Sequence, residues 1–346
     1  MMPTDEVESG ETSPELPEQN SRDCVAAVDI GGTSLRIALA DMTGDVVAEQ
    51  SASTVGVRDA AAVIEMIRNG VVGLIEQSGR SHDNLLAVAA GAPGITDADA
   101  GVVIATSYLM GWRQVPFQDL LESALEVPSA VENDVNLGAI GEQWRGAARN
   151  VRDFVFLAIG TGVGAGIVLD GKLFRGTGWS AGEIGYMLVP GTSTDPVADG
   201  DAGNLESLIG GEGIRAQWQK LWDAGGLALP RDLRATDVFD QARAGSPPAQ
   251  AVLQRSARLL AFAIYNMWLM FNCPLFVLGG SVGMHPALLE SAQLSLRELC
   301  GEAGPDLALS TLGTQAQLNG AIRLALDRAN AVRKNGTQFS SKNRGA

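Results

Sequence analysis

Three glycine-rich turns in this chain have the composition of sites that hold phosphate groups. The first, Asp29-Ile30-Gly31-Gly32-Thr33, separates two short apolar segments. Its two glycines allow backbone N–H groups to approach an anion closely, Thr33 adds a hydroxyl, and Asp29 has a carboxylate suited to hold Mg²⁺ through water. An ordinary hairpin turn is the alternative for this motif alone, because Gly-Gly pairs are common in hairpins.

The other two turns follow in the middle and in the last third of the chain. Gly160-Thr161-Gly162 lies between two strand-like segments and lacks the lysine of a Walker loop. The next segment continues as a strand, whereas a dinucleotide fingerprint requires a helix there. Gly279-Gly280 follows a strand and precedes a helix, which suits contact with a nucleoside. Three such turns in this order predict a nucleotide held between two hairpins.

These motifs resemble the two phosphate motifs and the adenosine motif of the actin-like ATPase superfamily. Within it, three further segments resemble the signature of the ROK family of bacterial sugar kinases and repressors: Glu132-Asn133-Asp134-Val135-Asn136, Gly141-Glu142 and Gly182-Glu183-Ile184-Gly185. The likeness extends over roughly 25–331. It implies an α/β protein with the two-domain actin-like ATPase (ribonuclease H-like) fold, an inter-domain cleft, and ATP and Mg²⁺ as reaction partners.

The pair Asn133-Asp134 lies where a predicted strand, Ser129–Glu132, meets a predicted helix. From the residues alone, one of the two is a helix N-cap. In the family that the chain resembles, the aspartate here is the general base that accepts the proton of the sugar hydroxyl, and the asparagine binds the sugar. Such a carboxylate complements the Mg²⁺ and backbone amides that neutralise charge in phosphoryl transfer. We therefore predict that Asp134 is the catalytic base.

The resemblance also implies residues of the sugar pocket. Gly94 lies in a turn whose family counterpart lines this pocket, and Glu183 and Glu206 match two carboxylates that accept hydrogen bonds from sugar hydroxyls. Tyr186 occupies the position at which typical members have a histidine, which binds zinc together with three cysteines. The loop that follows contains no cysteine, so zinc is not expected.

A second departure from the family pattern is Tyr108, because many members have an asparagine that touches the sugar at this position. Two substrate-side positions are thus tyrosine, while the ATP motifs are intact. Glucose, N-acetylmannosamine, N-acetylglucosamine and fructose all remain candidate substrates. Tyr186 has two interpretations, a sugar-contacting side chain or an aromatic that fills the space of the missing zinc.

The elements that position these motifs divide into two halves, as a length of 346 residues favours. We expect a smaller N-terminal domain at 21–133, with a helix at 315–331 packing back onto it, and a larger domain at 134–314. The acidic end at 1–20 and the polar end at 332–346 have too few apolar residues to become ordered.

Short apolar segments bounded by glycine-containing turns predict where the strands lie, and a longer segment predicts a helix. The predicted strands and helix are Val25–Ile30, Leu35–Ala40, Val46–Gln50, Leu85–Ala90, Phe154–Ile159, Ala165–Leu169, Lys172–Phe174 and the helix Ala60–Gln77. An apolar run at Leu259–Leu278 is close to membrane-spanning length, but Pro274 divides it. We interpret it as a buried helix ending near Asn272 and a strand, Leu275–Leu278.

Composition limits the partners and the compartment. The formal net charge is -15, from 25 Lys+Arg and 40 Asp+Glu, so nucleic acid is not an expected partner. Cys24, Cys273 and Cys300 are far apart in the sequence, which predicts reduced thiols rather than disulfides. No signal peptide is visible, and we expect a cytoplasmic homodimer without a membrane span.

The predicted function is ATP-dependent phosphorylation of a hexose or amino sugar. A sugar-sensing repressor is one alternative, but such proteins have an N-terminal winged helix, and only an acidic segment of about twenty residues precedes the first core strand here. The other is a catalytically silent sugar-binding or regulatory protein of this family, without a DNA-binding domain, which the two tyrosines motivate.

Overall fold

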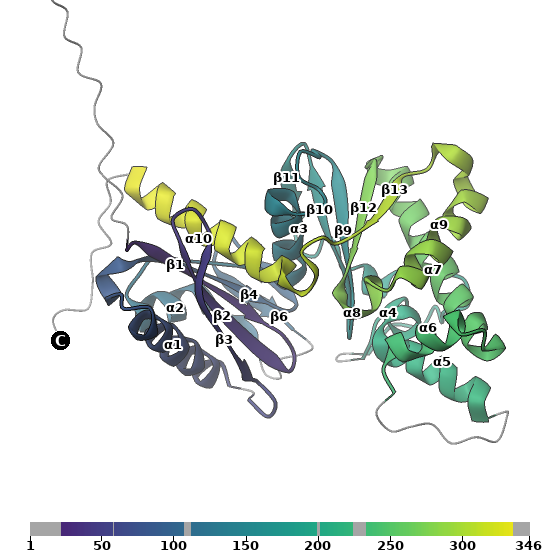
Figure 1. Ribbon diagram of the computed structural model, residues 1–346, viewed down its shortest axis with the longest axis horizontal. Helices are drawn as coiled ribbons and strands as arrows, with labels where there is room; N and C mark the ends of the chain where they lie inside the picture. Colours follow the sequence, from purple (N-terminus) through teal and green to yellow (C-terminus); the bar gives the residue numbers. More distant parts are fainter. Residues whose placement is uncertain (1–21, 58, 107–111, 199–200, 224–232, 335–346) are drawn as a thin grey trace, which may run out of the picture.

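The computed structural model describes residues 22–57, 59–106, 112–198, 201–223 and 233–334. Within them the chain forms two five-stranded sheets, each flanked by helices, and one three-stranded sheet. The large sheets lie in separate halves of the molecule, and helices α3 (Asp134–Arg145) and α10 (Ala316–Lys334) meet between them (Figure 1). The predicted α/β class is confirmed.

The first large sheet has the strand order β3-β2-β1-β4-β8. Its strands are β1 (Cys24–Ile30), β2 (Ser34–Asp41), β3 (Val46–Ser53), β4 (Leu85–Ala92) and β8 (Ser129–Asn133). Strands β1, β4 and β8 run parallel, so their carboxyl ends meet at one edge of the sheet, where Asp29 pairs with Gly91 and Gly91 pairs with Glu132. This register places residues about 100 positions apart in the sequence in one row across adjacent strands.

Strand β1 is buried along its whole length, and its side chains alternate between two cores. One set packs beneath α1 (Ala60–Gln77) and α2 (Phe117–Leu125), and the other packs against α10. The face toward α10 consists mostly of alanines contributed by three strands: Ala27, Ala38, Ala40, Ala87 and Ala89. Small side chains allow the helix to lie close to the sheet.

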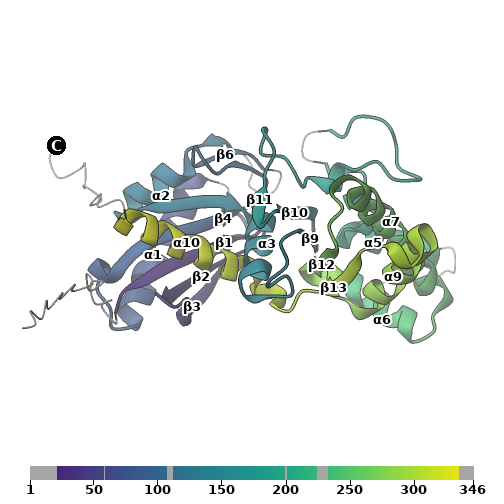
Figure 2. The same cartoon turned by 90° about the horizontal axis from the view of Figure 1, so that it is seen from above.

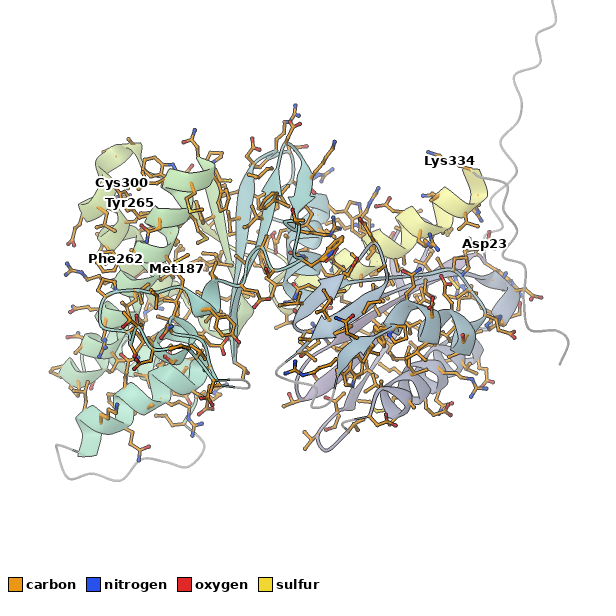
Figure 3. All side chains as sticks on the ribbon, turned by 180° about the vertical axis from the view of Figure 1, so that it is seen from behind. Asp23, Met187, Phe262, Tyr265, Cys300 and Lys334 are labelled. Carbon is orange, nitrogen blue, oxygen red and sulfur yellow. The ribbon has the colours of Figure 1, made fainter. Side chains whose placement is uncertain are left out.

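Helix α10, near the end of the sequence, therefore completes the core of the first half, whose strands come from the start of the sequence. An ion pair of 2.6 Å between Arg333 and Asp23 joins the end of α10 to the start of β1, and Asp23 and Lys334 lie at the same end of the molecule (Figure 3). Near the centre, α10 crosses α3 in backbone contact: a Cβ added to Gly320 would lie 1.9 Å from the carbonyl oxygen of Leu137. Only glycine permits this crossing distance.

The second large sheet has the order β11-β10-β9-β12-β13. Its strands are β9 (Phe154–Ile159), β10 (Val163–Leu169), β11 (Lys172–Phe174), β12 (Leu275–Gly279) and β13 (Asp306–Leu309). A layer of helices covers one face and α3 packs on the other (Figure 2). The covering helices are α4 (Glu206–Ile209), α5 (Gly211–Asp223), α6 (Ala235–Arg243), α7 (Pro247–Phe271), α8 (Gly280–Gly283) and α9 (Pro286–Cys300).

The elements predicted from the sequence are found within a few residues of their expected bounds. Helix α7 ends at Phe271, the next residue adopts a left-handed cap, and β12 follows Pro274, so the interpretation of the apolar run is confirmed. None of the described helices is long and apolar enough to cross a membrane. The C-terminal helix continues to Lys334, three residues beyond its expected end.

Several short elements were not predicted. The three-stranded sheet comprises β5 (Ile95–Asp97), β6 (Val102–Ala105) and β7 (Arg113–Val115). Single-turn 3₁₀ helices occur at η1 (His82–Asn84), η2 (Ile184–Tyr186), η3 (Gly301–Ala303) and η4 (Gly313–Gln315). Segments of three or four residues are too short to show a period of 2 or 3.6.

Candidate active site

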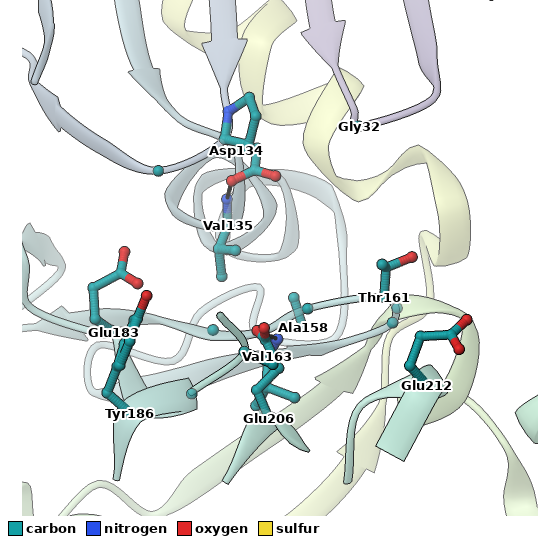
Figure 4. Close-up of a pocket in the computed structure, with 18 of the residues that line it drawn as sticks. Gly32, Asp134, Val135, Ala158, Thr161, Val163, Glu183, Tyr186, Glu206 and Glu212 are labelled. Carbon is teal, nitrogen blue, oxygen red and sulfur yellow. Dashed lines mark hydrogen bonds between the residues drawn. The ribbon is translucent and has the colours of Figure 1, made fainter. Parts of the chain in front are cut away.

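A cavity of about 450 Å³ lies between the two halves of the molecule, with walls from both large sheets. Gly32, Gly94 and Asn133 line it from the first half, and Asp134 lines it from the start of α3, between the two halves. The second half contributes the predicted residues Thr161, Gly162, Glu183, Tyr186, Glu206 and Gly280. Asp134 faces Glu183, Tyr186 and Glu206 across the cavity (Figure 4). The structure thus brings together all six residues predicted for the sugar and four of the eight predicted for ATP.

A second cavity of about 490 Å³ adjoins the first and shares Gly160, Thr161 and Glu212 with it. Its wall includes Ser281 at the start of α8 and Arg234 before α6. The glycine turn after β9 therefore borders both cavities. The sequence motifs predicted two parts of this wall, the turn at Gly160-Thr161 and the segment after Gly280, but not the part formed by α5 and the start of α6, which contains no such motif.

The turn between β8 and α3 shows which residue caps the helix. The Asn133 side chain accepts a hydrogen bond from the backbone N–H of Asn136 at 2.9 Å, so Asn133 is the N-cap of α3. Its amide nitrogen also donates to the carbonyl oxygen of Gly94 at 2.8 Å. Gly94 has φ +95, and an added Cβ would lie 2.3 Å from the carbonyl oxygen of Ala105. With the cap position filled, Asp134 is the first residue of the helix and lines the cavity.

Asp134 has an unusual protonation equilibrium for a carboxyl group. Burial raises its pKa from 3.8 to about 7, with smaller contributions from the negative charges of Asp29 and Glu183. A hydrogen bond of 2.9 Å from the Val135 N–H opposes this shift. A carboxylate with a pKa near neutrality accepts a proton from a bound hydroxyl more readily than an ordinary aspartate does.

This pKa predicts a pH dependence. Since the base must be unprotonated, activity with both substrates well below saturation should rise with pH and level off above about 7, the pKa of Asp134 in the free protein. Initial rates measured across this pH range test the prediction. A rate that is constant around pH 7 and falls only near the usual aspartate pKa of about 4 would contradict it.

The carboxylates of Glu183 and Glu206 face the same cavity from the second half. Glu206 accepts a hydrogen bond from the Val163 N–H at 2.8 Å, and burial raises its pKa. Burial also raises the pKa of Glu183, and the charge of Glu206 adds to this effect. Two partly buried carboxylates are satisfied when hydroxyl groups donate to them, as those of a sugar do.

Gly182 determines where Glu183 lies. It adopts φ +97, its carbonyl oxygen accepts from the Ala165 N–H at 2.8 Å, and an added Cβ would lie 1.9 Å from the Ala165 carbonyl oxygen. The backbone before Glu183 therefore lies directly against strand β10. No other residue type fits this position without moving Glu183.

Tyr186 ends η2 at the rim of the cavity, next to Glu183 (Figure 4), and its side chain is 47% exposed. If its hydroxyl forms a hydrogen bond with the sugar, Tyr186→Phe should weaken sugar binding by roughly 0.5–1.5 kcal/mol, the net contribution of one hydrogen bond. ATP affinity should stay constant. Calorimetric titration with sugar and with ATP measures both; unchanged sugar affinity would leave only a packing role for the ring.

Asp29 at the end of β1 is the predicted Mg²⁺ residue, and it is paired with a cation of the protein. Arg36 donates from Nε and Nη2 to Oδ2 of Asp29 at 3.1 and 2.5 Å, and also to the carbonyl oxygen of Thr314. Both contacts to Asp29 use one oxygen, so the other is not engaged by Arg36. A carboxylate oxygen suits Mg²⁺, which prefers oxygen ligands. Arg36 was not predicted, although it faces Asp29 in the β1–β2 register.

Four of the predicted ATP residues do not line either cavity in the described part of the chain: Asp29, Gly31, Thr33 and Gly279. Their neighbours Gly32 and Gly280 do. Gly280 has φ +79, and an added Cβ would lie 2.4 Å from the Ile159 carbonyl oxygen, so the turn before α8 is closely packed against β9. Tyr108 lies outside the described residues.

The zinc prediction concerns the segment after Tyr186. Among the described residues, no group of three or more His, Cys, Asp or Glu side chains is arranged to hold a metal ion. We expect the purified protein to contain no stoichiometric zinc, and chelation to leave its melting temperature unchanged, because the thiolate and imidazole ligands are missing. Metal analysis that finds about one zinc per chain would contradict this.

Comparison with known proteins defines the class and then the family. The arrangement of sheets matches sugar kinases with the actin-like ATPase fold, among them a ROK family glucokinase from Streptomyces griseus solved with glucose and AMPPNP (27% identity, TM-score 0.74, covering 88% of this chain and 99% of that one). The ROK family model matches residues 25–328. The chain belongs to the ROK family.

Three curated relatives carry different names. A glucokinase from Halalkalibacterium halodurans is 30% identical, over 89% of this chain and 96% of that protein. An N-acetylmannosamine kinase from Escherichia fergusonii is 31% identical, over 86% and 97%. A xylose repressor from Caldicellulosiruptor bescii is 24% identical, over 74% of this chain and 65% of that protein.

Proposed function

We propose that the protein is an ATP-dependent sugar kinase that transfers the terminal phosphoryl group of ATP to a hydroxyl of a hexose or amino sugar, with Asp134 as general base. One observation carries the proposal. A single cavity has a carboxyl group with a pKa of about 7 on one side and the glycine turn at Thr161-Gly162 on the other. The names of the kinase relatives support the same activity.

The sugar would bind in the first cavity. Glu183 and Glu206 accept hydrogen bonds from its hydroxyls, Asn133 holds it from the other side, and the backbone of Gly94 lines the pocket beside it. Asp134 aims the reacting hydroxyl and receives its proton as the new P–O bond forms. Because these groups hold the sugar in one orientation, much of the entropy loss that the reaction requires would occur when the sugar binds. The activation free energy of phosphoryl transfer would be lower for this reason.

ATP would extend from the second cavity toward Asp134. Backbone N–H groups of the turns at Gly32 and Thr161-Gly162 donate to its phosphates, and the start of α8 adjoins the nucleoside. Mg²⁺ bound with ATP supplies positive charge that offsets the charge of the transferring phosphoryl group, and Asp29 is the residue suited to hold it. Because the protein is acidic, these local donors replace a general positive field.

We assign the smaller domain to 21–133 with the helix at 315–331, and the larger domain to 134–314. Closure of the domains around both substrates would exclude water and prevent hydrolysis of ATP. We also propose that the protein acts as a cytoplasmic homodimer. Light scattering after size exclusion, and fractionation of cells, test these two assignments.

An ATP-consumption screen over glucose, fructose, N-acetylglucosamine, N-acetylmannosamine and related sugars tests the activity. We expect at least one sugar to be phosphorylated, and none in the absence of Mg²⁺. Silence with every sugar, together with sugar binding measured by calorimetry, would favour the second candidate. That candidate is a sugar-binding regulator, for which the repressor relative and Tyr186 in the pocket are the supporting observations.

A further inference from the structure

One ion pair ties the two large sheets together beside the catalytic turn. Arg175, the residue after β11, donates from Nε to Oε2 of Glu132 on β8 at 2.8 Å, and its Nη2 lies 2.6 Å from the same oxygen. Strands β8 and β11 are the edge strands of their respective sheets. The Glu132 side chain is 1% exposed and that of Arg175 31%. This pair therefore connects the two halves at a buried position.

The other oxygen of Glu132 holds the turn that carries Asp134. Oε1 accepts from the Asn133 N–H and from the side-chain amide of Asn136, both at 3.0 Å. These donors lie on either side of Asp134 in the sequence. The orientation of Glu132 thus determines the path of the backbone at the catalytic base.

Arg175 begins the segment that carries the sugar-binding carboxylate. Its carbonyl oxygen accepts from the Ala181 N–H at 3.2 Å, which closes a loop immediately before Gly182 and Glu183. One residue is therefore bonded through its backbone to the segment with Glu183, and through its side chain to the turn with Asp134. A buried carboxylate such as Glu132 requires a cation, so the pair cannot separate without a large cost.

We propose that Arg175 is a positioning residue that, through Glu132, holds the base Asp134 in register with the sugar-binding Glu183. This role rests on the proposed kinase function. The alignment of hydroxyl and base then depends on an ion pair that touches neither substrate. Displacement of a reacting group by about 1 Å costs on the order of a hundredfold in rate.

Arg175→Met tests the proposal, because it removes the charge but keeps an aliphatic side chain. We expect kcat to fall by about 10- to 100-fold with a much smaller change in the KM for ATP. The unpaired charge of Glu132 should also move the acidic limb of the rate profile to higher pH. Glu132→Gln, which keeps an acceptor for Asn133 but leaves Arg175 unpaired, should move the limb to lower pH.

The charges that face Asp134 from other elements, Asp29 on β1 and Glu183, are unchanged in both variants. The matched control is Arg152→Met, which breaks an exposed ion pair with Asp170 in the β10–β11 turn, at the opposite end of β11 from Arg175. It should leave kcat and the pH profile unchanged. If Arg175→Met behaves like this control, or lowers only the melting temperature, the proposal is wrong.

Amide hydrogen exchange of the full chain gives a readout that does not require activity. Exchange at Asn133 and Asn136 should become faster in Arg175→Met and not in Arg152→Met. Faster exchange in a protein that phosphorylates no sugar would reject the kinase function alone, whereas an active wild type with unchanged exchange and kcat in the variant would reject the positioning role alone. If Arg175→Met fails to fold, Arg175→Lys replaces it. Because lysine keeps the charge but not the geometry of arginine, we then expect a reduced kcat and an acidic limb of the rate profile at the wild-type pH.

Discussion

Asp134→Asn is expected to lower kcat by roughly two to four orders of magnitude, the usual scale for removal of a general base. Asparagine has nearly the same shape and still accepts the Val135 hydrogen bond, so ATP and sugar should bind with affinities within about threefold of the wild type. Rates under saturating substrate and calorimetric titrations measure the two quantities separately. Turnover within about threefold of wild type would mean that Asp134 is not the base.

The folded state of this variant can be checked by its own pH dependence. Folding raises the Asp134 pKa from 3.8 to about 7, so the charged form is disfavoured in the native state. Wild-type stability therefore falls, relative to Asp134→Asn, as the pH rises from about 4 to 7. The variant should melt at a higher temperature than wild type at about pH 8, and the difference should vanish near pH 4. Asp201→Asn, which removes one negative charge from an exposed position on the same cavity, serves as the control.

Gly182→Ala is expected to reduce kcat/KM for the sugar by about 10- to 100-fold and to lower the melting temperature, with ATP affinity nearly constant. The positive φ of this residue costs an alanine about 1–2 kcal/mol, and the 1.9 Å approach to the Ala165 carbonyl oxygen forces the backbone to move as well. Because Glu183 follows directly, its carboxylate moves with the backbone. Steady-state kinetics in each substrate and thermal melting measure the effects.

Gly171→Ala separates the two contributions. Gly171 has φ +76 in the turn between β10 and β11, and no atom lies within 4 Å of an added Cβ. This control has the strained φ without the collision, so it should lose stability but retain sugar kinetics. Equal kinetic losses in the two variants would show that strain, and not displacement of Glu183, reduces the activity.

Local patterns were enough to predict most strands, both ends of α1 and the C-terminal end of α7, because the apolar segments are bounded by glycine, proline or polar residues. The glycine turns were also visible, since positive φ or close backbone approach leaves few residue choices. The same patterns could not decide between Asn133 and Asp134 as the cap. Both residue types serve as N-caps, and only the hydrogen bonds to Gly94 and Asn136 distinguish them.

The pairs that organise the site could not be predicted, because they join residues distant in the sequence. Glu132 and Arg175 are separated by 43 positions and come from different sheets. Each, taken alone, is an ordinary charged residue at the end of an apolar segment. The raised pKa of Asp134 has the same origin, since it depends on burial in the completed cleft and on charges from two other elements.

The position of α10 has a consequence for how the chain acquires its structure during synthesis. The alanine face of β1, β2 and β4 is covered by α10, which begins at Ala316. Strands made first must therefore wait for nearly the whole chain to be translated before their second core can close. The second half draws its core from a continuous stretch of sequence and can condense earlier. A ribosome-bound chain that stops before α10 would thus display a preformed second half beside an incomplete first one, with an exposed apolar sheet face for chaperones to bind.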